Sequence, residues 1–312
     1  LLPTQPNKSA TIKKQKTTKC QWKTKLQYVQ RKKKTNSQFS IEFFPPKNVE
    51  NEAKLDKVFE KLSKLNPHFF SVTYGAGGST KKGTQELTFR YLKRGAIVAP
   101  HMSFGGTCES SVGSLLKDYG RAGIKRIVVL RGDLPAGSAD PPRHANELVE
   151  FIRRETGDQF HIDVACYPEI HPESASIDTE VKYFKRKVDA GADSAITQYF
   201  YNADAYFRYR DFCHKEGIQI PIVPGVMPIT NYQNLSRFSA SCGAEIPRWL
   251  RFQLERLSTD KLALQEFGVE IMTELCGKLL SGGAPGLHFY SMNLASSVTK
   301  VWSNLGLAER GS

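Results

Sequence analysis

From residue 39 onward, short apolar runs alternate with longer amphipathic stretches. The short runs are rich in β-branched and aromatic residues, a composition that favours strands. Helical spacing is clearest in the stretch 55–65, where Leu55, Val58, Phe59, Leu62 and Leu65 form an apolar stripe. The pattern predicts eight strands, over 39–44, 69–74, 96–104, 126–131, 160–167, 194–200, 220–227 and 286–291.

Helical patterns fill the gaps between these strands. Strands that alternate with helices form parallel βαβ units, and eight such units in about 270 residues match an α/β fold of the (β/α)8 TIM barrel type. A doubly wound open sheet is the competitor, but it usually carries a glycine-rich turn after its first strand, where this chain has Pro45-Pro46. Besides the stretch 55–65, the predicted helices cover roughly 81–94, 109–122, 143–156, 181–188, 203–216, 231–241, 260–281 and 295–305.

The basic charge of the chain lies before the predicted barrel. The 312 residues carry a net charge of +13, but residues 1–38 hold eleven Lys and Arg and no Asp or Glu, which leaves +2 for 39–312. This first segment has few large apolar residues, so we expect a disordered basic tail over 1–38 and one catalytic domain over 39–312. A cationic tail can also bind phosphate polymers, which makes a nucleic-acid-binding protein the alternative outside the enzymes.

Several classes of protein are excluded by composition. No stretch approaches the ~18 apolar residues of a membrane-spanning helix, and no apolar segment follows the basic start as in a secretory signal. The start is loosely compatible with an organelle transit peptide, although it has a single arginine. The six cysteines form no C-x-x-C pair and no zinc-type spacing with histidine, so we expect no metal and a reducing, cytoplasmic setting.

In a TIM barrel the reactive groups lie at the carboxyl ends of the strands. Glu42 ends the first strand within the run FSIEFFPP, and its phenylalanine neighbours predict a desolvated carboxyl with a raised pKa, as a general acid requires. The alternative is an outward-facing Glu42 paired with a lysine. Asp133 follows Arg131-Gly132 at the end of the fourth strand, where it is either a functional carboxylate or a simple turn residue.

Other strand ends offer weaker signals. His101 either contacts a ligand or is a structural histidine. Gln198 either forms hydrogen bonds to the donor and acceptor groups of a heterocyclic ligand or is a buried amide bonded to the backbone. Arg186 and Lys187 belong to a solvated basic helix face or to a phosphate site. The glycine run at 75–80 matches G-x-G-x-x-G incompletely, and we expect a flexible loop whose backbone can approach a ligand.

Taken together, the body resembles the methylenetetrahydrofolate reductase family in its bacterial single-domain form. The resemblance extends from about Phe39 to Leu307 and is carried by stretches such as SIEFFPPK (40–47), RGDLPAG (131–137), ACYPEIHPES (165–174) and GLHFYSMN (286–293). It implies a TIM barrel in which NADH or NADPH gives hydride to FAD. A folate then accepts hydride at its one-carbon unit and becomes 5-methyltetrahydrofolate. The implied partners are small molecules and further copies of the chain, with no membrane and no nucleic acid required.

The resemblance also implies residue roles. Glu42 would be the acid that helps open the folate to a reactive iminium, and Asp133 would support this cation while contacting the flavin. Gln198, Asn234, Phe238 and Tyr290 would contact the folate. The flavin would be held by Thr73, Tyr74, Ala76, His101, Arg131, Gly132, Asp133, Ala145, Tyr167, His171, Ser174, Glu180, Tyr183, Arg186 and Lys187.

The chain departs from the family pattern near both ligands. Glu180 and Tyr183 stand where many relatives carry Asp and Asn toward the cofactor, and the segment 81–85 lacks a usual carboxylate and arginine. Leu294 replaces an arginine toward the folate tail, so it cannot pair with a glutamate carboxylate. A different flavin barrel, of the proline dehydrogenase type, is the rival within the enzymes, and the contexts of Glu42 and Asp133 speak against it.

Overall fold

The computed structural model describes residues 37–74, 81–104, 108–132 and 143–307, and the predicted tail at 1–38 lies outside this part except for its last two residues. All paired strands in the described part run parallel, in the order β7-β6-β5-β4-β3-β2-β1-β9-β8. The strands are β1 (Gln38–Phe43), β2 (Phe69–Val72), β3 (Val98–Met102), β4 (Arg126–Val129), β5 (His161–Cys166), β6 (Ser194–Thr197), β7 (Ile222–Val223), β8 (Gly225–Val226) and β9 (Gly286–Tyr290).

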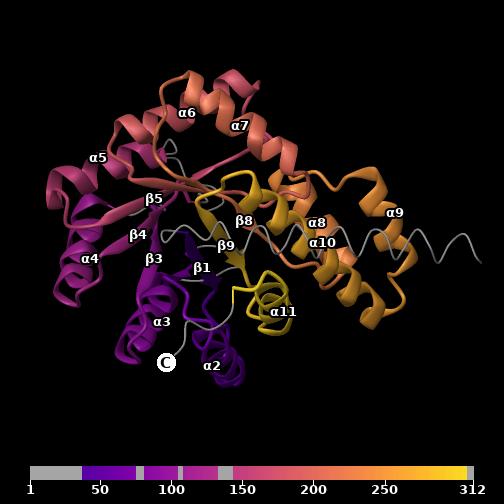
Figure 1. Cartoon of the computed structure of the whole chain (residues 1–312). Coiled ribbons are helices and arrows are strands. Elements are labelled where there is room, and N and C mark those ends of the chain that lie inside the picture. Colours follow the sequence, from indigo (N-terminus) through magenta and orange to yellow (C-terminus); the bar gives the residue numbers. More distant parts are fainter. Residues whose placement is uncertain (1–36, 75–80, 105–107, 133–142, 308–312) are drawn as a thin grey trace, which may run out of the picture.

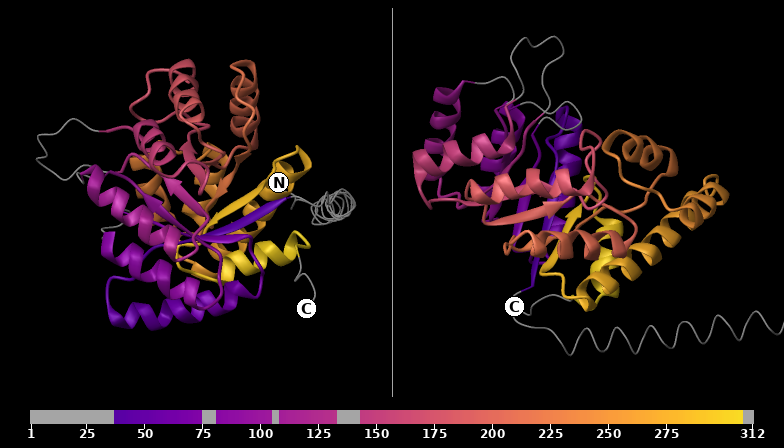
Figure 2. Two further views of the ribbon diagram at one scale, coloured as in Figure 1. Left: turned by 90° about the vertical axis from the view of Figure 1, so that its left-hand side faces the viewer. Right: turned by 90° about the horizontal axis from the view of Figure 1, so that it is seen from above.

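The sheet closes on itself through one interrupted strand. β7 pairs with β6 and β8 pairs with β9, and only Pro224 separates β7 from β8. Proline has no N–H for a ladder bond, which explains the break, while its carbonyl oxygen still accepts from His288 N at 3.0 Å. The first and last strands, far apart in the sequence, lie side by side (Figure 2). The predicted TIM barrel is therefore confirmed, with its seventh strand broken in two.

Helices surround this barrel (Figure 1). Several begin at a side chain that accepts a backbone N–H, such as Asn48, Ser176 and Asn231, which are preferred N-cap residues. The helices are α2 (Val49–Ser63), α3 (Lys81–Lys93), α4 (Glu109–Arg121), α5 (Ala145–Thr156), α6 (Ile177–Asp189), α7 (Ala203–Lys215), α8 (Tyr232–Cys242), α9 (Arg248–Arg256), α10 (Lys261–Ser281) and α11 (Ser296–Asn304).

Successive residues of β1 face opposite sides of the barrel wall. Phe43 points outward, where its ring stacks on Phe70 at 5.3 Å and meets Tyr91 of α3 at 5.7 Å. Ser40 and Glu42 point inward, because side chains alternate along a strand. The helix layer therefore packs against the apolar side of the strand, and the polar side chains are left for the interior.

An ion pair closes the end of the barrel where the strands begin. Arg126 at the start of β4 makes two hydrogen bonds to Asp163 of β5, of 2.6 and 2.9 Å, and Asp163 is fully buried. The guanidinium also lies over the ring of Phe69, 4.3 Å from its centroid. A buried carboxylate needs such a partner, so this end is a sealed floor and the opposite end is the open mouth.

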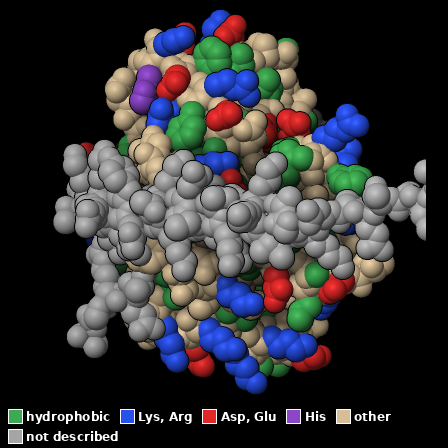
Figure 3. All heavy atoms as spheres, turned by 45° about the vertical axis from the view of Figure 1, so that its right-hand side comes forward, with side chains coloured by type: hydrophobic (Ala, Val, Ile, Leu, Met, Phe, Trp, Pro, Cys, Tyr) green, Lys and Arg blue, Asp and Glu red, His purple; other side chains and the backbone are tan. Residues whose placement is uncertain are grey.

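The surface of the described part carries charges of both signs. Figure 3 shows acidic and basic side chains interspersed on the face that it draws. No helix among the described residues is long and apolar enough to cross a membrane.

Candidate active site

Glu42 lies inside the barrel, near its mouth. Its side chain is 14% exposed, and Oε2 is 3.3 Å from His101 Nε2 of β3 and 3.4 Å from His288 Nε2 of β9. Ser71 of β2 donates to the same oxygen at 3.5 Å. The inward position excludes the alternative of an outward-facing Glu42 paired with a lysine.

The predicted raised pKa of Glu42 is wrong. Burial alone raises the pKa, but hydrogen bonds from His101 and His288, together with the charge of both rings, outweigh it and lower the pKa to about 2. The phenylalanines that motivated the prediction are neighbours in sequence only, since Phe43 belongs to the opposite face of the strand. Glu42 is therefore an ionised carboxylate beside two imidazoles.

A cavity of about 560 Å³ opens at the carboxyl ends of the central strands. A pocket of this size at this end of a TIM barrel is where a ligand is expected. It brings together most of the residues predicted for the flavin. Its lining includes Tyr74, Arg131, Gly132, Ala145, Tyr167, His171, Ser174, Glu180, Tyr183, Arg186, Lys187 and Gln198.

Three cations stand along this cavity. Lys187 is partly buried, and desolvation lowers its pKa; in the described residues its ammonium donates one hydrogen bond, to Ala165 O at 2.8 Å. Arg131 forms a bidentate ion pair with Glu173. Arg186 is exposed and lies over the ring of Tyr183, 5.4 Å from its centroid. Such a row of donors suits the phosphates of a dinucleotide.

Glu180 has a structural task beside this cavity. Its side chain is almost completely buried, and its carboxylate accepts from Ser174 Oγ at 2.7 Å and from His171 N at 3.3 Å. It thereby fixes the loop after β5 against the first turn of α6. The exposed neighbour Tyr183 leaves its ring open to the cavity rim.

The predicted folate contacts fall into two groups. Gln198 lines the cavity, and Tyr290 reaches across the barrel to donate to Thr197 O at 2.7 Å. Asn234 and Phe238 lie on α8, outside the lining of this cavity, where Asn234 Oδ1 accepts from Arg237 at 3.2 Å. Leu294 is 43% exposed, so its apolar side chain faces solvent.

Four other predicted residues remain. Ala76 and Asp133 lie outside the described residues, whereas Thr73 and His101 are described and are not part of the cavity lining. Thr73 is buried next to Phe43, whose carbonyl accepts its backbone N–H at 2.9 Å. His101 contacts Glu42 and also lines a small neighbouring pocket with Tyr74.

Sequence reasoning missed several residues at the mouth. His144 and Asn146 line the cavity at the start of α5. Their position just after the fourth strand's loop could have indicated them, because every βα loop of a barrel borders the mouth. His288 gave no signal of this kind, since it reaches Glu42 only through the pairing of β9 with β1.

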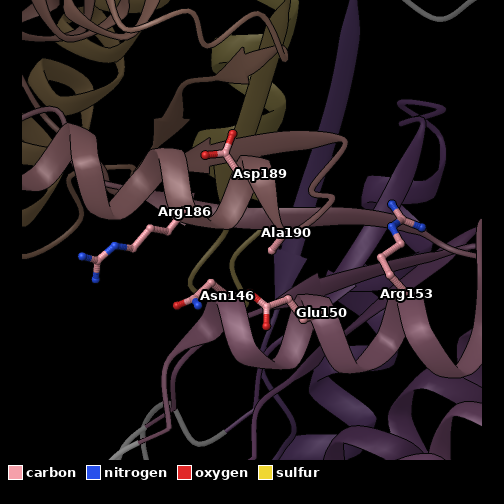
Figure 4. A pocket seen from close by; sticks show the side chains of 6 residues that line it. All are labelled: Asn146, Glu150, Arg153, Arg186, Asp189 and Ala190. Atoms are coloured by element: carbon pink, nitrogen blue, oxygen red, sulfur yellow. The ribbon is translucent and has the colours of Figure 1, made fainter.

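A second hollow, of about 650 Å³, lies on the outside between α5 and α6 (Figure 4). Arg153 at one end is already bonded to Gly191 O and Asp193, and acidic Glu150 and Asp189 share the groove. Its mixed charges and engaged arginine make it a poor ligand site. The described residues also contain no group of His, Cys, Asp and Glu that could hold a metal ion.

Comparison with known proteins finds related sequences over most of the chain. The family model described as methylenetetrahydrofolate reductase matches residues 26–306. The chain is 39% identical over 271 residues to the 5,10-methylenetetrahydrofolate reductase of Buchnera aphidicola subsp. Schizaphis graminum, covering 86% of this chain and 92% of that protein. The Escherichia coli K12 protein of the same name is 37% identical over 269 residues, covering 86% and 90%.

A plant protein and a solved structure are also similar to this chain. A probable methylenetetrahydrofolate reductase (NADH) of Oryza sativa is 36% identical over 290 residues, which are 87% of this chain and 48% of that longer protein. Among solved structures, an uncharacterized Clostridium thermocellum protein that binds two copies of 5-methyl-5,6,7,8-tetrahydrofolic acid superimposes with a TM-score of 0.59. It shares 18% identity, covering 91% of this chain and 97% of that one, and at this distance it supports the fold alone.

Proposed function

Because the chain belongs to the methylenetetrahydrofolate reductase family, we propose that its barrel mouth reduces 5,10-methylenetetrahydrofolate to 5-methyltetrahydrofolate. The proposed hydride donor is NADH or NADPH, and FAD, when bound, would be the cofactor that carries the hydride. One observation carries the proposal: the cation-lined cavity lies at the same end of the barrel as the Glu42 carboxylate and its two imidazoles. The proposed flavin site and the proposed proton donor, Glu42, therefore lie at the same end of the barrel.

The residues present fit FAD. Lys187 and Arg186 supply positive charge for the two phosphates, and Lys187 has donor capacity beyond its bond to Ala165 O. Arg131 lies beside them in its ion pair with Glu173. The rings of Tyr167 and His171, with centroids 4.6 Å apart, form an aromatic wall of the cavity. When bound, FAD supplies the group that accepts and returns hydride.

The remaining residues act on the folate. Glu42 passes a proton to the folate as the one-carbon bridge opens, and Asp133 supports the positive charge that develops there. Gln198, with Oε1 turned to Tyr199 N at 3.0 Å, presents its amide nitrogen to the pterin or to the nicotinamide in turn. Phe238, Asn234 and Tyr290 complete the proposed folate contacts. Self-association of the chain stays a prediction.

The test uses the full chain loaded with FAD under anaerobic conditions. We expect NADH or NADPH to bleach the flavin, and 5,10-methylenetetrahydrofolate to restore its colour. Glu42→Gln keeps the first step within about twofold and slows the second at least ~100-fold, the usual contribution of a general acid. Glu245→Gln, a change at an exposed carboxyl, serves as the matched control. Equal losses in both steps would contradict the role of Glu42.

A further inference from the structure

Helix α8 carries two of the proposed folate contacts, Asn234 and Phe238. The helix buries Leu235 and Ser239, and Phe238 is half-buried beside them. Together with Cys242, these three residues follow the spacing i, i+3, i+4 and i+7, so they share the face that is turned to the barrel. A helix with one buried aliphatic side chain gains little from apolar packing. Its position therefore depends on the polar contacts that it makes.

Tyr199, two residues after β6, contacts this face of α8. Its hydroxyl oxygen is 3.1 Å from Ser239 Oγ and accepts a hydrogen bond from Cys242 Sγ at 3.4 Å. Its backbone N–H donates to Gln198 Oε1 at 3.0 Å. The tyrosine is 5% exposed, so the surrounding core holds its ring in one place. One residue thus contacts both α8 and the amide that lines the cavity at the barrel mouth.

A second contact joins the segment after α8 to the loop after β5. The backbone N–H of Glu245 donates to Glu169 Oε2 at 2.8 Å. Gly243 ends α8 with a φ of 74°, and a Cβ at this glycine would lie 3.0 Å from Pro172 Cγ. Ile170 in the facing loop also has a positive φ, of 70°, which is unusual for a β-branched residue. Both backbones are therefore shaped to approach each other closely here.

This contact region borders the proposed folate site. A narrow cleft of about 10 Å³ lies between the end of α8 and the two strand-end loops, and its lining includes Gln198, Glu169, Tyr199, Cys242 and Gly243. A space of this size holds about one water molecule. Gln198 also lines the large cavity at the barrel mouth. The attachment of α8 is therefore separated from that cavity by a single side chain.

We propose that Tyr199 and Glu169 are positioning residues for the folate. They fix the carboxyl-terminal end of α8 against the strand-end loops, so that Phe238 on the helix and Gln198 after β6 bind the same molecule. This inference rests on the proposed function. Neither residue touches the reacting atoms: Glu169 acts through α8, and Tyr199 acts through α8 and Gln198. Helix α8 belongs to the folate site because these two side chains hold it there.

The two contacts can be removed separately. Tyr199→Phe removes the hydroxyl but keeps the ring and the backbone N–H that holds Gln198. Glu169→Ala removes the acceptor of the Glu245 N–H, whereas Glu169→Gln keeps an oxygen in its place. We expect Tyr199→Phe and Glu169→Ala to weaken folate binding about tenfold, the effect of losing about one hydrogen bond. Glu169→Gln should bind the folate within about twofold of the wild type, because its amide oxygen still accepts that N–H.

The first test is an anaerobic calorimetric titration of 5-methyltetrahydrofolate into the FAD-loaded protein, with its flavin fully reduced so that no turnover occurs. Rapid mixing with 5,10-methylenetetrahydrofolate gives the rate at saturating folate, which should stay within about twofold of the wild type because the lost interaction serves binding alone. Ser236→Ala, at an exposed position of α8, is the control and should change neither value. Flavin content and melting temperature identify the variants that are folded. An unchanged affinity in Tyr199→Phe or in Glu169→Ala, or no rescue by Glu169→Gln, would overturn the inference.

The second test does not depend on the folate. Hydrogen exchange of the FAD-loaded protein, followed by mass spectrometry, should show faster exchange of the α8 amides in Tyr199→Phe and Glu169→Ala. Glu169→Gln and Ser236→Ala should keep the wild-type exchange rates. Unchanged α8 exchange in the first two variants would refute the inference alone. A wild type that binds no folate would instead refute the proposed function, and this inference with it.

Discussion

Glu169 offers a prediction whose size follows from the structure. This carboxyl follows β5 at the barrel mouth, and its Oε2 accepts from the backbone N of Glu245 at 2.8 Å. Burial raises its pKa from 4.5 to about 7, against the lowering effect of that hydrogen bond. We expect Glu169→Gln to stabilise the protein at pH 8 but not at pH 4.5, because the amide oxygen keeps the hydrogen bond and never ionises.

The sign follows from the direction of the pKa change. A carboxyl whose pKa is higher in the folded than in the unfolded chain binds protons preferentially in the fold, so stability falls as pH rises from 4.5 to about 7 and then levels off. A pKa difference of this size between the folded and the unfolded chain corresponds to a free energy of about 3 kcal/mol. Because the side chain is partly open to solvent, we discount this to about 1–2 kcal/mol.

The assay is thermal unfolding of wild type and variant between pH 4.5 and 8. At ~2–4 °C per kcal/mol, the variant should melt roughly 2–8 °C higher at pH 8 and at the same temperature at pH 4.5. Glu266→Gln removes an exposed charge that does not contribute to the pKa of Glu169, so it should change the melting temperature little. A difference that is constant with pH, or a variant that is less stable at pH 8, would refute the reasoning.

Two further predictions concern the floor and an exposed thiol. Arg126→Ala should lower the free energy of unfolding by about 3–5 kcal/mol, because it leaves Asp163 buried and unpaired. The control Arg121→Ala, at an exposed arginine, should lower it by less than ~0.5 kcal/mol in the same urea titration. Similar unfolding midpoints for the two variants would argue against a sealed floor. Hydrogen bonds from Ser110 and Ser111 lower the pKa of Cys108 to about 7, so its alkylation by iodoacetamide should have a midpoint near pH 7. Cys213 should react far more slowly, because burial raises its pKa to about 12. Mass spectrometry that finds Cys213 modified first would contradict this prediction.

The barrel could be predicted from the sequence because its signals are local. Each strand is a short β-rich run, and the helices lie where the apolar spacing indicates. Helix α9 was missed because it is short and carries Trp249 and Phe252 on its exposed side, which obscures the buried pair Leu250 and Leu254. The break at Pro224 depends on closure of the ring, which no local pattern encodes.

The site was predictable where it depends on strand ends and not where it depends on pairing. The residues at the ends of β4, β5 and β6 line the cavity as the barrel rule requires. The error about Glu42 arose from treating its sequence neighbours as its surroundings. Its true environment comes from His101, 59 positions away, and from His288, 246 positions away, which only the register of the sheet brings together.

The most direct test of the central claim is a single turnover. Holoprotein reduced anaerobically is mixed with 5,10-methylenetetrahydrofolate, and flavin absorbance and folate products are measured together. We predict one 5-methyltetrahydrofolate formed for each flavin reoxidised, at the same rate. Flavin that stays reduced, or that reoxidises without forming this product, would contradict the account.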